Sequence, residues 1–262
     1  MSSTARSASV TMRKREAAAT RVRSSVLGRI RALLEQDTRI HLHRCPIALS
    51  FEGEDLVLAG EVEHIAAKKI ALQLAATVAP TARIVDRLHL VPAELMGDRE
   101  IRDHVVKVLL EEPALEHCMV QSQMPPKMDI QRKAVSEPAG TLLVEVTDGV
   151  VTLNGEVPSL SHKRLAGVLA WWVPGCRDVI NGLAEVPAEQ DNDDELTDAV
   201  CLVLEKDPVV HATKIHVTTK DWVVTLDGLV PSETMKQMAE RDTWCVLGVK
   251  EVVNRIEVMV KG

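Results

Sequence analysis

An internal repeat constrains the fold of this chain more than any other feature. Three apolar segments each carry a glycine near their end: Leu56–Val62, Val151–Val157 and Val224–Val230. An Asp or Asn inside a second apolar segment follows each glycine by 26 residues; the pairs are Gly60 and Asp86, Gly155 and Asn181, and Gly228 and Asn254. A spacing kept to the residue indicates one structural unit that occurs three times.

The order of elements within the unit follows from its apolar periodicity. Ile101, Val105 and Leu109 recur at helical spacing before the second glycine segment. In the first copy Ile47, Leu49 and Phe51 occupy alternate positions, as in a strand with one buried face. The prediction is an α+β fold of three tandem αββαβ two-layer sandwiches, each with a three-stranded mixed sheet and two helices on one face.

The repeats set the expected boundaries along the chain. The expected segments are a basic, disordered arm at 1–21, a degenerate first repeat at 22–92, a second repeat at 96–187 and a third repeat at 192–260. The second repeat carries an insertion at about 120–141, which we expect to be an exposed loop. Acidic residues 189–195 read as a solvated linker. Gly60, Gly155 and Gly228 are expected to be structural, because glycine in a strand marks a bulge or a close backbone approach.

Charge is distributed unevenly. Of the 31 Lys and Arg, eight lie in residues 1–31 beside one acidic residue, Glu16, so this segment is net +7 and the remainder net −14. The arm would be attracted to an anionic membrane, whereas one Phe, four Trp and no Tyr argue against base stacking and nucleic-acid binding. Scattered cysteines indicate a reducing compartment. The expected location is the cytoplasm, with peripheral attachment to the inner membrane as the alternative.

The repeat motif resembles the BON domain family of bacteria. The third copy resembles it most, in Trp222–Gly228 with Gly248–Asn254; the second has Pro174-Gly175-Cys176, and the first departs from it with Ala79-Pro80-Thr81. The resemblance implies the αββαβ sandwich, no enzymatic activity and an association with osmotic and envelope stress. It further implies contact with phospholipid, a small ligand or a partner protein, and it extends to cytoplasmic proteins with three such domains.

Three groups of residues are candidates for partner or lipid binding. Met124 and Met128 lie in the proline-containing insertion, where they could dock a partner. Trp171 and Trp172 end a helix, so one is expected in the core and the other could anchor a partner or a membrane. Arg13, Lys14 and Arg15 form the basic centre of the arm.

The sequence predicts no enzyme, no cofactor and no metal. His41, His43 and Cys45 would share one face if they lay on a strand, which leaves metal binding as a remote alternative. We therefore expect a non-enzymatic, stress-associated scaffold that binds a partner protein or complex. The alternatives are a peripheral binder of anionic phospholipid and a sensor of a small ligand or ion.

Overall fold

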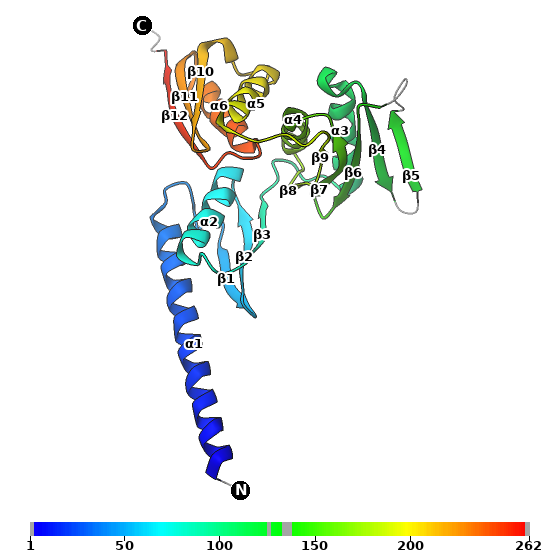
Figure 1. Cartoon of the computed structure of the whole chain (residues 1–262). Coiled ribbons are helices and arrows are strands. Elements are labelled where there is room, and N and C mark those ends of the chain that lie inside the picture. The colour runs from blue at the N-terminus through cyan, green and yellow to red at the C-terminus, as the bar shows by residue number, and fades with distance from the viewer. Residues whose placement is uncertain (1–2, 125–126, 133–137, 260–262) are drawn as a thin grey trace. The chain divides into compact units, whose positions relative to one another are not determined.

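The computed structural model describes residues 3–124, 127–132 and 138–259, with side chains for 18–123 and 138–259 (Figure 1). Six α-helices and three mixed sheets make up this described part, which is an α+β fold. The chain forms two compact units, Met1–Val91 and Pro92–Gly262, and each is described by itself.

The first unit contains one repeat. Its elements are α1 (Ser3–Gln36), β1 (Ile47–Glu52), β2 (Asp55–Val62), α2 (Ile65–Val78) and β3 (Ile84–Leu90). β1 and β2 form an antiparallel hairpin, and β3 pairs with β2 in parallel. Burial of Ile30, Leu34, Leu56, Leu58 and Leu88 forms the core between the helices and the sheet.

Helix α1 includes the segment that we expected to be a disordered arm. It begins at Ser3. Residues 3–27 contain neither glycine nor proline, the two residue types that most disfavour a helix interior. Residues 18–25 are exposed, and burial begins with Ile30 and Leu34. Arg13, Lys14 and Arg15 lie in this helix, but their side chains fall outside the described residues.

The second unit contains two repeats. The second repeat consists of α3 (Asp98–Glu111), η1 (Pro113–Leu115), β4 (Cys118–Met124), β5 (Lys127–Arg132), β6 (Gly140–Thr147), β7 (Val150–Val157), α4 (Leu160–Trp171), β8 (Asp178–Asn181) and β9 (Ala184–Glu185). The third consists of α5 (Asp193–Lys206), η2 (Ala212–Lys214), β10 (Ile215–Lys220), β11 (Val223–Val230), α6 (Glu233–Cys245) and β12 (Glu251–Val258). The third sheet, β10-β11-β12, repeats the pairing of the first.

The insertion in the second repeat is not a loop, as we had expected, but adds two strands to the sheet. β4 pairs in parallel with β6 and antiparallel with β5, giving the order β5-β4-β6-β7-β8, with β9 also paired to β7. Val120 and Ser122 are buried two positions apart, the period of a strand with one covered face. The prediction of a three-stranded sheet is therefore wrong for this repeat.

The repeat glycines permit a close approach between the two hairpin strands. Gly155 has φ 121°, and a Cβ atom there would overlap the carbonyl oxygen of Thr141 on the partner strand. Gly60 has φ 138°, and a Cβ atom there would lie 2.5 Å from the carbonyl oxygen of Pro46. Only glycine combines such a φ with the absence of a Cβ atom.

The residue 26 positions after each glycine attaches the last strand to the second helix. Asn181 Nδ2 donates to the Lys163 carbonyl oxygen at 2.7 Å, and Asn254 Nδ2 donates to that of Lys236 at 3.1 Å. In the first repeat Asp86 instead pairs with Lys68 Nζ at 3.0 Å. Strand and helix are thus joined by the same two positions in each copy, which explains why the spacing does not vary.

We predict that Gly155→Val destabilises the second unit by at least about 3 kcal/mol, because it combines an unfavourable φ with overlap against Thr141. Urea unfolding and resistance to trypsin measure the effect. Gly97→Ala is the control, since a Cβ atom there meets nothing within 4 Å; it should cost no more than about 1 kcal/mol. Unchanged trypsin resistance of Gly155→Val would contradict the structural role.

Candidate functional site at the junction of the second and third repeats

The helix layers of the second and third repeats meet inside the second unit. α4 packs against both α5 and α6, while α3 is linked to α5 through side chains. This junction gathers most of the buried charged groups of the unit, among them Arg164, Glu112, Asp207 and Asp242. Charged groups are rarely buried without partners. The contacts of these groups therefore show how the two repeats are joined.

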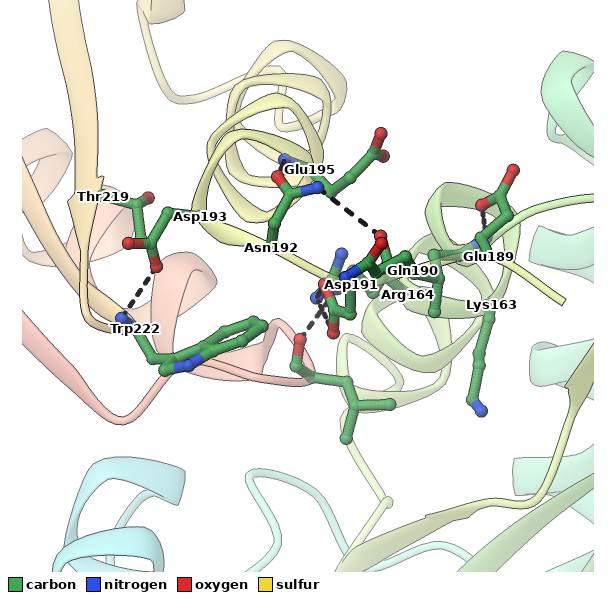
Figure 2. Close-up of polar contacts among 12 residues, drawn as sticks. Lys163, Arg164, Glu189, Gln190, Asp191, Asn192, Asp193, Glu195, Thr219 and Trp222 are labelled. Atoms are coloured by element: carbon green, nitrogen blue, oxygen red, sulfur yellow. Dashed lines mark hydrogen bonds and ion pairs between the residues drawn. The ribbon is translucent and has the colours of Figure 1, made fainter.

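Arg164 of α4 joins three segments of the junction (Figure 2). Its side chain is 1% exposed, and Nη2 donates to both carboxylate oxygens of Asp191 at 2.7 and 2.8 Å, whereas Nη1 is buried without a hydrogen-bond partner among the described residues. Its Nε donates to the carbonyl oxygen of Leu247, in the turn before β12, at 2.9 Å. Gly248 follows with φ 101°, and a Cβ atom there would lie 3.0 Å from the guanidinium. The turn glycine of the third repeat therefore leaves room for an arginine of the second.

The acidic segment 189–195 is largely exposed, as its composition suggested, but hydrogen bonds also hold it in place. Glu189 accepts a hydrogen bond from the Leu160 backbone N–H at the start of α4 at 2.7 Å, and Asn192 caps α5. Asp193 accepts from the backbone N–H of Asp221 at 2.8 Å and from that of Trp222 at 2.9 Å, the latter drawn in Figure 2. Together with the pairing of Asp191 to Arg164, these bonds give the segment a fixed course between the repeats.

Two further polar contacts cross the junction. Lys206 of α5 pairs with the buried carboxylate of Glu112, which follows α3, at 2.6 Å. Trp172, the residue after α4, donates its indole N–H to Asp242 of α6 at 2.9 Å. Burial and the neighbouring Asp207 carboxyl raise the pKa of Asp242 from 3.8 to about 8. Asp242 is therefore largely protonated at neutral pH.

The tryptophan pair lies at this junction. Both Trp171 and Trp172 are half-buried, so the expected division into one core and one exposed ring is not what the structure shows. The physical reason is that the end of α4 faces another repeat rather than its own sheet alone. Trp172 is engaged with Asp242 and does not offer its indole N–H to a membrane or an outside partner.

The remaining candidates lie apart from the junction. Met124 ends β4 and Met128 lies in β5, but both side chains fall outside the described residues. His41, His43 and Cys45 occupy a turn instead of a strand, closed by backbone bonds from Arg44 and Cys45 to the His41 carbonyl oxygen. His41 Nδ1 lies 2.6 Å from Glu63, and burial raises the pKa of the Cys45 thiol.

The described residues contain no group of three or more His, Cys, Asp or Glu side chains arranged to hold a metal ion. Among the described helices, none is both long and apolar enough to cross a membrane.

Comparison with known proteins gives one clear match. Residues 129–187 and 192–259 match the BON domain, and no curated protein matches the chain. Among solved structures, the C-terminal domain of CdsD, the structural protein of the type III secretion system of Chlamydia trachomatis, is 13% identical, with 84% of this chain and 93% of that chain covered at a TM-score of 0.23. Another CdsD structure is 14% identical, with 90% and 92% covered at 0.24. TM-scores this low support no inference, whereas the two domain matches show that residues 129–187 and 192–259 of this chain are BON domains.

Proposed function

We propose that this protein is a non-enzymatic scaffold that binds a partner protein at the added edge of the second repeat. The observation that carries the proposal is a groove of about 330 Å³ between α3 and β4. It exists because the inserted hairpin widens the sheet beyond the strands that the two helices of a three-stranded repeat would cover.

The lining of the groove suits a peptide segment. Val106 and Leu110 provide apolar side chains, and Asp103, Lys107 and Glu111 place both signs of charge along the same stretch of α3. Apolar contacts with charged groups around them are typical of protein interfaces, in which the apolar centre supplies affinity and the rim supplies orientation. The neighbouring sheet edge, β5, can also accept a further strand, a common mode of peptide recognition.

The test compares two leucine substitutions in the tagged full-length chain. Leu110→Asp changes the groove, whereas Leu95→Asp changes a residue that is 95% exposed and outside it. After capture from the source organism, quantitative mass spectrometry should find a protein enriched by wild type and Leu95→Asp but reduced about tenfold or more by Leu110→Asp. Equal recovery with both variants, or no stoichiometric protein with the wild type, would count against the proposal, provided that circular dichroism shows both variants folded.

Binding to anionic phospholipid is a second candidate function. Arg21, Arg29 and Arg31 are exposed on α1, which supports it, and each basic residue near an anionic surface contributes about 1 kcal/mol. In this mode the basic helix would hold the protein at the inner membrane.

Vesicle flotation tests this second function. Full-length protein should float with phosphatidylcholine vesicles containing phosphatidylserine at low salt, but not at 0.5 M NaCl, where charges are screened. Deletion of residues 1–21 should weaken flotation, whereas Arg99→Gln, which removes an exposed arginine of α3, should not. Salt-independent flotation, or none at all, would exclude this mode.

A further inference from the structure

Asp242 and Asp207 are two buried carboxyl groups at the junction of the second and third repeats. Asp242 is 1% exposed and Asp207, directly after α5, is 7% exposed. Asp242 Oδ1 accepts the indole N–H of Trp172, which belongs to the second repeat. Its Oδ2 is buried and has no partner of good hydrogen-bond geometry among the described residues. A carboxylate in this position would have one oxygen without compensation.

The groups around Asp242 favour its protonated form. The neighbouring Asp207 carboxyl, directly after α5, raises the pKa of Asp242, and Lys206 beside it is already paired with Glu112. Trp172 from α4 and Arg241 on α6 itself act in the opposite direction, but burial and Asp207 outweigh them. The strands packed on α6 contribute buried apolar side chains, including Leu226 of β11 and Ile256 of β12.

We propose that Asp242, Asp207 and Trp172 form a pH-responsive lock between the second and third repeats. When the junction is closed, Asp242 Oδ2 keeps its proton beside Asp207. When that proton passes to a base in the solvent, two carboxylates remain in a site from which the second repeat excludes water. No other bond changes, and opening the junction hydrates the new charge.

The direction of the pH dependence follows from the raised pKa. A closed junction holds Asp242 at a pKa of about 8, above its ordinary 3.8, so closure is favoured by protonation. The contribution is fully present below about pH 4 and is lost as the pH rises to about 8. The closed state should lose about tenfold in its equilibrium constant per pH unit between pH 5 and 7, and little more above pH 9.

Hydrogen–deuterium exchange of the full-length chain, corrected for the intrinsic pH dependence of exchange, tests this lock at pH 6.5 and 9. In the wild type, amides of α4 and of α5 and α6 should exchange about thirtyfold faster at the higher pH. Asp242→Asn, which cannot ionise, should remove this difference. Asp198→Asn, on the exposed face of α5, should retain it.

A second variant keeps the test decisive if Asp242→Asn fails to fold. Since Asp207 raises the pKa of Asp242, Asp207→Asn should lower the pH above which exchange no longer accelerates, and so reduce the difference between pH 6.5 and 9. The lock is refuted if Asp242→Asn responds to pH as the wild type does, or if the wild type does not respond. It is equally refuted if exchange rises only within the third repeat, with α4 unaffected.

Discussion

The buried guanidinium of Arg164 is the interaction on which the second unit depends. Burying a charge is costly, and Arg164 offsets that cost with Asp191 and the Leu247 carbonyl oxygen. Because these partners lie in the segment between the repeats and in the last turn before β12, one side chain of α4 ties the second repeat both to that segment and to the third repeat. The contacts of Lys206 with Glu112 and of Trp172 with Asp242 lie in the same junction.

This junction determines which surfaces remain for binding. The helices of the two repeats contact one another, whereas the groove beside α3 and the edge strand β5 lie outside these contacts. The second repeat differs from the third mainly at this edge, where β4 and β5 are added. A scaffold built from similar domains gains specificity from such a difference, since the shared αββαβ frame is common to all copies.

Much of the repeated frame was predictable, and its irregular parts were not. The glycine and the Asn or Asp 26 residues later act through the backbone or within one repeat, so their effect leaves a fixed spacing in the sequence. The inserted strands were missed because Met124-Pro125-Pro126 reads as loop chemistry, although Val120 and Ser122 already alternate. Partial matches at 129–187 and 192–259 confirm the family for copies two and three.

The junction could not have been read from the sequence, for a physical reason. Arg164 and Asp242 look like ordinary polar positions of amphipathic helices, and their burial arises only when another repeat covers them. The acidic composition of 189–195 correctly suggested an exposed segment, but not that its side chains serve as caps and ion-pair partners. The one available signal was Arg164 lying directly before the apolar run that ends in Trp171 and Trp172.

The central claim is that Arg164 makes the second and third repeats one cooperative unit, and native-state hydrogen exchange of Arg164→Met tests it most directly. In the wild type, core amides of β7 and β11 should open with the same free energy. In Arg164→Met these free energies should separate by about 2 kcal/mol or more, since a buried ion pair and its hydrogen bond are lost. Arg99→Met, at a position 79% exposed, should leave them equal. Equal opening free energies for β7 and β11 in Arg164→Met would contradict the claim.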